Sequence, residues 1–336
     1  MSYRILLTGG CGFIGSHVVR ALLSTFDDIL VVNFDKLDYC SNINHLKEFD
    51  DDPRYVFVKG DILEPHLVSY ILEHHAINTV MHFAAQTHVD NSFGNSLSFT
   101  RNNVEGTHVL LEACRTYRSI KRFIHVSTDE VYGTADSSTP GRCEDAVLAP
   151  TNPYSASKAA AEMVVRAYHT SYGLPVIITR GNNVYGPGQF PEKIIPKFLL
   201  QIMRDIPLTI HGTGENARHY IHVRDVAKAF IKILCHGEIG STYNIGVEDE
   251  KTNLEVANTL LTLMDKPLDF LRHVEDRKFN DFRYPVNSSR LHSLGWSPTI
   301  SWEDGLAETI EWYRANVTDY WPKEHLARVT DPHPSL

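Results

Sequence analysis

The first half of the chain alternates short, apolar, β-branched runs with longer segments of helical periodicity. Strands are predicted at 4–8, 29–34, 55–59, 79–83, 122–126 and 176–180, and helices at 15–24, 65–73, 99–115 and 154–172. This strand–helix alternation predicts an α/β protein with a doubly wound parallel sheet. Ligands of such sheets lie at the carboxyl ends of the strands. Polar residues that directly follow a strand are therefore the first functional candidates.

After Arg180 the alternation loosens in a proline-containing stretch. Shorter strands at 208–211 and 242–245 are interspersed with helices at 194–204, 223–235 and 254–264. We interpret this half as a smaller C-terminal α/β domain that covers the first. The expected division is 1–180 for the cofactor domain and 181–321 for the substrate domain, with segments such as 220–246 able to return to the first. A mobile tail is expected at 322–336.

The composition narrows the range of partners. With 336 residues, 43% of them hydrophobic and 22% charged, the chain is typical of a soluble protein of about two domains. A net charge of −9 argues against nucleic acid as a partner, and no apolar stretch is long enough to span a membrane. The five cysteines are scattered without metal-ligand spacing, so we expect no metal site and free thiols in a cytoplasmic protein without a signal peptide.

A glycine-rich turn joins the first predicted strand to the first helix. Gly9, Gly12 and Gly15 permit a tight turn, close approach to a pyrophosphate and close helix–strand packing. The helix start, which includes Phe13 and Ile14, presents backbone N–H groups to an anion. The turn therefore predicts a Rossmann-type, NAD-binding domain.

Residues after the next strands complete the predicted cofactor site. Asp35 ends the second strand, 20 residues after the last glycine, where an acidic residue binds an adenosine ribose and favours NAD over NADP. The neighbouring Lys36 leaves open contact with a 2′-phosphate. The further predicted contacts are Asp61 and Ile62, where an adenine could rest, and the small Ala84 and Ala85. Asp61 could equally be an ordinary loop-starting aspartate.

A hydroxyl and two adjacent carboxyl groups follow the fifth predicted strand: Thr128, Asp129 and Glu130. One of two adjacent carboxyl groups is easily forced to hold its proton. A neighbouring acid and base is what an elimination requires, because one group takes a proton from carbon and the other gives a proton to the leaving hydroxyl. The alternative is that these residues simply cap a helix.

Tyr154 and Lys158 are four residues apart behind Pro153, which suits the first turn of a helix. This spacing puts both side chains on one helix face. A lysine cation near a phenol lowers the pKa of the phenol, so the phenolate can take a proton from a substrate hydroxyl. The alternative is an ordinary surface pair.

Together these motifs resemble the extended short-chain dehydrogenase/reductases, and more narrowly the nucleotide-sugar 4,6-dehydratases that act on dTDP-glucose or UDP-glucose. The resemblance runs from about residue 4 to 320 and includes 84–90, 127–133, 183–193 and 243–246. It also adds Asn103 to the cofactor contacts. The Thr-Asp-Glu run distinguishes the dehydratases from related 4-epimerases, because the epimerases lack the acid–base pair.

The resemblance implies a role for each catalytic residue. Tyr154 takes the proton of the sugar 4-hydroxyl, Thr128 hydrogen-bonds the resulting ketone, and Lys158 keeps the tyrosine ionised and binds the nicotinamide ribose. Glu130 then removes the C5 proton, and Asp129 protonates the departing 6-hydroxyl. A hydride passes to NAD⁺ and returns, so the reaction is a hydro-lyase reaction that yields a 4-keto-6-deoxyglucose nucleotide.

The resemblance also implies the substrate contacts. They are Asn183, Glu192, Lys193, Arg218, Asn244, Arg277 and Asn280, with His88 and Asp90 as further candidates near the sugar. The two arginines match those that grip the diphosphate, and guanidinium groups suit phosphate oxygens. Taken alone, each arginine could equally be an exposed surface residue.

Segments 38–42, 91–95 and 279–281 look closer to the dehydratase domain of plant rhamnose synthases, which use UDP-glucose. UDP-glucose is therefore favoured over dTDP-glucose, as an early step towards rhamnose, although the two bases differ by one methyl group. We expect a homodimer through 99–115 and 154–172, with the downstream epimerase and reductase on a separate protein. The alternatives are a UDP-sugar 4-epimerase and an inactive NAD-binding scaffold.

Overall fold

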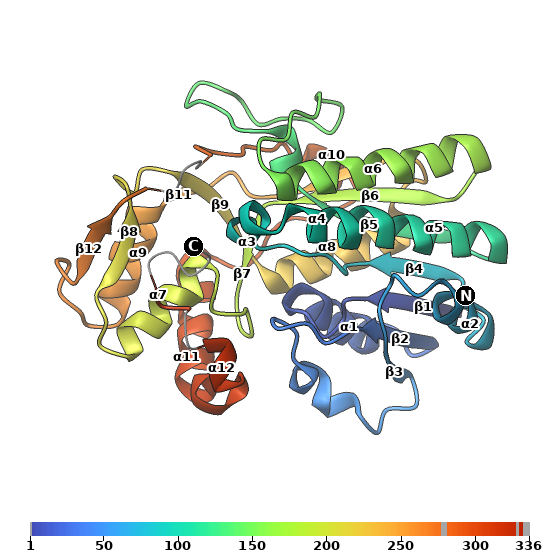
Figure 1. Cartoon of the computed structure of the whole chain (residues 1–336), viewed down its shortest axis with the longest axis horizontal. Coiled ribbons are helices and arrows are strands. Elements are labelled where there is room, and N and C mark those ends of the chain that lie inside the picture. Colours follow the sequence, from blue (N-terminus) through green and yellow to red (C-terminus); the bar gives the residue numbers. More distant parts are fainter. Residues whose placement is uncertain (1, 277–280, 327–328, 332–336) are drawn as a thin grey trace.

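A seven-stranded sheet lies at the centre of the larger domain, between two layers of helices (Figure 1). The structure is a computed structural model, and it describes residues 2–276, 281–326 and 329–331. The strand order is β10-β6-β5-β4-β1-β2-β3, and each neighbouring pair is parallel. The strands are β1 (Tyr3–Thr8), β2 (Ile29–Asp35), β3 (Tyr55–Lys59), β4 (Thr79–His82), β5 (Arg122–Thr128), β6 (Val176–Gly181) and β10 (Thr242–Ile245). The predicted α/β class and doubly wound parallel sheet are confirmed.

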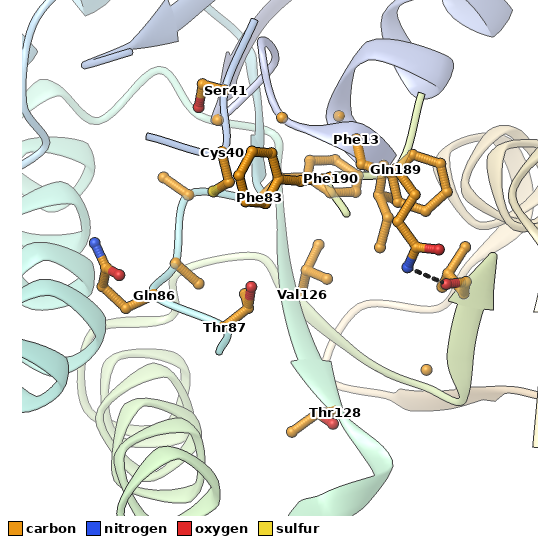
Figure 2. A pocket seen from close by; sticks show the side chains of 18 of the residues that line it. Phe13, Cys40, Ser41, Phe83, Gln86, Thr87, Val126, Thr128, Gln189 and Phe190 are labelled. Carbon is orange, nitrogen blue, oxygen red and sulfur yellow. Dashed lines mark hydrogen bonds between the residues drawn. The ribbon is translucent and has the colours of Figure 1, made fainter. Parts of the chain in front are cut away.

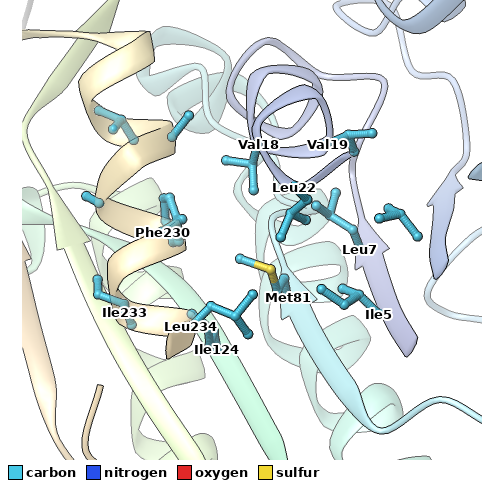
Figure 3. Packing of buried hydrophobic residues seen from close by; sticks show 14 of the residues in the cluster. Ile5, Leu7, Val18, Val19, Leu22, Met81, Ile124, Phe230, Ile233 and Leu234 are labelled. Carbon is cyan, nitrogen blue, oxygen red and sulfur yellow. The ribbon is translucent and has the colours of Figure 1, made fainter. Parts of the chain in front are cut away.

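Helices cover both faces of this sheet because its strands are apolar on both sides. One face packs against α1 (Phe13–Thr25) and α8 (Val223–His236), as Figure 3 shows. The other packs against α2 (Pro65–His74), α5 (Gly106–Tyr117) and α6 (Pro153–Tyr172). Ile5 and Leu7 of β1 point into the first core and Leu6 into the second, as the two-residue period of a strand requires.

Shorter elements lie around the carboxyl ends of the strands. They are η1 (Ile43–Phe49), α3 (Val89–Gly94), α4 (Ser96–Phe99), η2 (Thr100–Glu105) and η3 (Asp129–Tyr132). The single helix predicted at 99–115 is in fact α4, a π-helical turn at η2 and α5, which follow one another without a break.

The second domain lies beside the carboxyl ends of the large sheet (Figure 1). It contains a three-stranded sheet, β11-β9-β7, and a two-stranded sheet, β12-β8. Its elements are β7 (Asn183–Tyr185), α7 (Ile194–Met203), β8 (Leu208–His211), β9 (Ala217–His222), β11 (Glu250–Thr252), α9 (Asn253–Leu263), β12 (Leu271–Val274), α11 (Trp302–Tyr320) and α12 (Lys323–Leu326). The short helix α10 (Ser289–His292) packs instead against β10 of the large sheet, where Leu291 joins the core shared with α1 and α8. Residues 223–245 leave this domain to supply α8 and β10 to the first.

The tail expected to be mobile is in part packed. The described residues after 321 include the short helix α12, and Leu326 and Val329 are buried against the core of the second domain. The two apolar side chains stand in a polar, proline-containing stretch, whose local sequence pattern did not indicate that they would be buried. Among the described residues, no helix is long and apolar enough to cross a membrane. All five cysteines are free thiols.

Candidate active site

A cleft lies at the carboxyl ends of β1, β2, β4, β5 and β6, where the second domain meets the large sheet. It contains a cavity of about 330 Å³, of the size that small ligands occupy. Figure 2 shows Thr128 and Val126 on β5 on one side of this cavity, with Gln189 and Phe190 of the second domain close by. The sequence-predicted residues in its lining are Gly9, Gly12, Phe13, Ile14, Gly15, Asp35, Lys36, Asp61, Ile62, Ala84, Ala85, Thr128, Asp129, Glu130, Tyr154, Lys158, Asn183, Glu192 and Lys193.

The glycine turn has the geometry expected of a phosphate-binding loop. Gly9 has a φ of +75°, and a Cβ there would lie 2.7 Å from the backbone N of Ala84. A Cβ at Gly15 would lie 2.3 Å from the carbonyl oxygen of Gly9. Larger residues are therefore excluded at both positions, and the start of α1 turns its backbone N–H groups towards the cleft.

Asp35 lies at the end of β2 with its carboxylate fixed by the loop. Its Oδ2 accepts from the backbone N of Cys11 at 2.9 Å, and its Oδ1 accepts from that of Leu37 at 2.8 Å. The neighbouring Lys36 Nζ lies 3.3 Å from Asp38 Oδ2 and 3.9 Å from Asp61 Oδ2. Two carboxylates thus balance the lysine charge, which makes this end of the cleft a poor site for an additional phosphate.

Asn103 lies behind the cleft rather than in its lining. Its side chain is buried, donates to the Gln86 carbonyl at 3.0 Å and to Ser157 Oγ at 2.9 Å, and accepts from the Gln86 backbone N at 2.8 Å. The preceding Asn102 lines the cavity instead and accepts a hydrogen bond from Lys36. Both belong to the π-helical turn η2, a feature often found at functional sites.

Thr128, Asp129 and Glu130 lie where β5 ends and η3 begins. The Thr128 hydroxyl donates to Asp129 Oδ1 at 3.1 Å and accepts from the Glu130 backbone N at 3.3 Å. The threonine thus caps η3 as the alternative interpretation expected, yet all three side chains also line the cavity. The cap holds the two carboxyl groups at the cleft.

The two carboxyl groups have different surroundings. Burial, and then the neighbouring Glu130, raise the pKa of Asp129 to about 7, against hydrogen bonds from Asn182 and Thr128. Burial also raises the pKa of Glu130, and the hydrogen bond from Asn152 is the foremost influence that lowers it. Asp129 therefore keeps its proton up to neutral pH, as a general acid must.

Tyr154 and Lys158 are both buried on α6 at the cleft. The expectation that the lysine lowers the pKa of the phenol is wrong for this structure. Burial and the carboxylates of Glu130 and Asp129 raise the pKa of Tyr154, and only a hydrogen bond with Thr128 opposes them. The lysine Nζ donates to the Val126 carbonyl at 2.6 Å, and burial lowers its pKa to about 8.

A second pocket adjoins the first on the side of the smaller domain. Glu130, Asn183, Glu192 and Lys193 line both pockets, so the two form one continuous cleft. The second pocket also contains the predicted residues His88, Asp90 and Arg218. Burial lowers the pKa of His88, whereas the nearby carboxylates of Glu192 and Asp90 oppose this shift.

One predicted substrate contact, Asn244, does not line either pocket of the cleft. Asn244 is wholly buried, its Nδ2 donates to the Arg142 and Asn287 carbonyls at 2.9 Å, and its Oδ1 accepts from the Tyr132 hydroxyl at 2.8 Å. This amide holds loops together behind the site, so its prediction as a substrate contact is wrong. Arg277 and Asn280 lie outside the described residues.

The sequence interpretation missed residues that hold the carboxyl groups. Asn182 Nδ2 donates to Asp129 Oδ2 at 2.8 Å, and Asn152 Nδ2 donates to Glu130 Oε2 at 3.1 Å. Tyr39 also lines both pockets and donates to Glu192 Oε2 at 2.7 Å. Two signals were available in the sequence: Asn182 directly follows a strand, and Asn152 stands before Pro153 where a helix cap is expected.

With this geometry established, comparison with known proteins defines the class of protein. A model of the family described as GDP-mannose 4,6 dehydratase matches residues 6–309. The chain belongs to this family, and its relatives identify it as a member of the nucleotide-sugar 4,6-dehydratases.

Individual relatives fall on both sides of the dehydratase–epimerase division. The chain is 53% identical over 335 residues to a trifunctional UDP-glucose 4,6-dehydratase/UDP-4-keto-6-deoxy-D-glucose 3,5-epimerase/UDP-4-keto-L-rhamnose-reductase of Arabidopsis thaliana, covering 99% of this chain and 50% of that protein. It thus spans about half the length of this relative. The crystal structure of DesIV, a dTDP-glucose 4,6-dehydratase from Streptomyces venezuelae with NAD and TYD bound, is similar with a TM-score of 0.91 and 41% identity, covering 95% of this chain and 99% of that one. A UDP-glucose 4-epimerase from Thermotoga maritima is more distant, with a TM-score of 0.85 and 29% identity, covering 93% and 99%.

Proposed function

We propose that this protein is an NAD-dependent hydro-lyase that converts a nucleoside-diphosphate glucose to the 4-keto-6-deoxyglucose nucleotide and water. The observation that carries the proposal is the pair Asp129 and Glu130 in one cleft, with the pKa of Asp129 raised to about 7. A 4-epimerase only oxidises and re-reduces one carbon, so it has no use for a carboxylic acid beside a carboxylate.

Each cleft residue then has one task. Tyr154 accepts the proton of the sugar 4-hydroxyl, and the Thr128 hydroxyl hydrogen-bonds the oxygen of the ketone. Because that ketone acidifies the neighbouring C5 hydrogen, Glu130 removes it as a proton. Asp129 gives its proton to the 6-hydroxyl, which leaves as water. Glu130 returns the proton to C5 when C6 is reduced, and Lys158 donates a hydrogen bond at the base of the cleft.

The first pocket supports NAD as the cofactor. The glycine turn suits a pyrophosphate, Asp35 suits a ribose hydroxyl, and the neutralised Lys36 disfavours a 2′-phosphate. When bound, NAD supplies the acceptor and donor of the transferred hydride and a positive ring charge, which opposes the raised pKa of Tyr154. Asp61, Ile62, Ala84 and Ala85 complete the proposed lining.

The second pocket supports an anionic sugar nucleotide as the substrate. Arg218 and Lys193 bring positive charge to it, and His88, Asp90 and Glu192 offer polar groups for sugar hydroxyls. Of the two candidate nucleotides, we propose UDP-glucose as the substrate. The chain is 53% identical to the Arabidopsis relative whose name includes UDP-glucose 4,6-dehydratase, and 41% identical to the dTDP-glucose 4,6-dehydratase DesIV.

The test is to incubate the purified protein with UDP-glucose and dTDP-glucose in parallel, without added NAD, and to follow the products by mass spectrometry. Loss of one water from either sugar nucleotide supports the proposal, and the faster substrate identifies the preferred base. An isomer of unchanged mass would establish a 4-epimerase instead. Bound NAD without turnover of any sugar nucleotide would favour the inactive scaffold.

We also propose a homodimer that pairs α4–α5 and α6 with their copies. Three large apolar side chains on these helices are exposed: Leu97, Met163 and Tyr172. Light scattering coupled to gel filtration gives the mass directly. Met163→Glu is expected to yield a monomer, and a wild-type protein that elutes as a monomer contradicts the proposal.

A further inference from the structure

Asn152, the residue directly before α6, contacts both the start of this helix and the side chain of Glu130. Its Oδ1 accepts from the Ser155 backbone N at 2.8 Å, and Ser155 Oγ accepts from the Asn152 backbone N at 3.2 Å. This reciprocal cap begins the helix that carries Tyr154 and Lys158. Asn152 Nδ2 donates to Glu130 Oε2 at 3.1 Å. Since Oδ1 is committed to a backbone N–H, the amide NH₂ must face the carboxylate.

A second carboxyl group lies within reach of the same amide. Asn152 Nδ2 lies 3.5 Å from Oδ2 of Asp281, which is 6% exposed. Asp281 also accepts from Thr151 Oγ1 at 2.8 Å and from the Tyr284 hydroxyl. The asparagine amide therefore offers a hydrogen to each of two neighbouring carboxyl groups.

The electrostatic surroundings of Glu130 make this donor important. Arg218 and Lys193 favour its ionised form from a distance, whereas burial and Asp281 oppose it. Asn152 supplies the hydrogen bond to the carboxylate itself and is the foremost favourable influence. Within the part of the chain that the structure describes, the titratable and charged groups around Glu130 are Asp129, Tyr154, Lys193, Arg218, Asp281 and Tyr284.

We infer that Asn152 is a positioning residue that keeps Glu130 unprotonated and directed into the cleft, so that Glu130 serves as the base and Asp129 as the acid. The inference rests on the proposed dehydratase function. If Asn152 only capped α6, any other good capping residue would replace it. If it also holds Glu130, capping residues without an amide donor are inadequate.

Two substitutions separate these roles. Asn152→Asp and Asn152→Ser both retain an oxygen that caps a helix as well as asparagine does. Aspartate also has the same shape and suits the positive end of a helix. Neither offers the amide donor to Glu130. Ser155→Ala is the matched control, because it weakens the cap and leaves the hydrogen bond between Asn152 and Glu130 in place.

The kinetic test is a single turnover of UDP-glucose in D₂O with NAD present. In both Asn152 variants we expect deuterium uptake at C5 and water loss to slow by about 10- to 100-fold, the loss expected for a hydrogen bond to a charged group. The oxidised hexose that still carries its 6-hydroxyl should accumulate. The acidic limb of the pH–rate profile should move to higher pH. Ser155→Ala should lower the thermal midpoint and leave the acidic limb in place.

A second measurement decides the inference without turnover. Carbon-13 NMR of labelled glutamate carboxyl groups, with the Glu130 signal assigned from Glu130→Gln, follows the titration of this residue. In Asn152→Ser, Glu130 should titrate at higher pH than in the wild type. An unchanged titration and an unchanged acidic limb would reduce Asn152 to a capping residue. A wild type that never removes water would instead defeat the dehydratase proposal, while the NMR titration would still decide the role of Asn152.

Discussion

Replacing the proposed general acid should make the protein more stable above neutral pH. Asp129 is 3% exposed, and burial beside Glu130 raises its pKa from 3.8 to about 7. Below about pH 4 the carboxyl group is protonated in both the folded and the unfolded chain, so it does not affect stability. Between about pH 4 and 7 the folded state binds a proton that the unfolded state lacks, so stability falls as pH rises.

The difference between about 7 and 3.8 corresponds to a loss of about 4 kcal/mol, complete above pH 7. Asp129→Asn removes this loss because an amide does not titrate. Its oxygen can still accept from Asn182, and its NH₂ can donate to Thr128, so the hydrogen-bonding groups at the site remain matched. The variant should therefore gain up to about 4 kcal/mol over the wild type between pH 4 and 8, while losing dehydration.

Urea unfolding of both proteins, with NAD in excess, from pH 5 to 8.5 gives the difference in unfolding free energy. The exposed Asp269→Asn is the matched control, because it removes a carboxylate that is not buried. A difference that stays constant across this range would refute the reasoning, since it would mean that the Asp129 carboxyl group is not held protonated by its surroundings. The assignment of Asp129 as the acid would then fail with it.

Three further outcomes are expected. Dehydration by the wild type should decline as pH rises through about 7, because Asp129 must be protonated to act, and a pH–rate profile checks this. Glu162→Gln should lower the free energy of unfolding in urea by about 3–5 kcal/mol, because it leaves the buried charge of Arg180 without its partner. In the wild type, Arg180 Nη2 lies 2.7 Å from Glu162 Oε2. Replacing both residues with methionine should recover much of the lost stability. Gly15→Ala should sharply weaken NAD binding measured by calorimetry, because the added Cβ would lie 2.3 Å from the Gly9 carbonyl oxygen, and unchanged affinity would contradict the assigned role of the turn.

The local pattern of the sequence was sufficient for the large sheet. Its strands and helices are marked by periodicity and by glycine and proline, and such signals depend on neighbours within a few residues. The glycine turn, the Thr128–Glu130 run and the Tyr154/Lys158 pair are short motifs of the same local kind. Their shared location at one edge of the sheet follows from the parallel topology, since all carboxyl ends of the strands meet there.

The sequence was insufficient wherever chemistry depends on burial or on distant partners. The amides that hold Asp129 and Glu130 come from 53 and 22 residues away along the chain. The surroundings of Asn244 also depend on distant parts of the chain. Its position in the sequence matched a substrate contact, but its side chain is buried among loops in the folded protein.

By itself, then, the sequence determined the order of strands and helices and the chemical groups available at the edge of the sheet. The tertiary structure decided which of two adjacent carboxyl groups holds its proton and which amide supports the other. It also decided that the phenol of Tyr154 has a raised pKa in these surroundings. The physical reason is that desolvation and hydrogen bonding act through space, between residues that only the folded chain brings together.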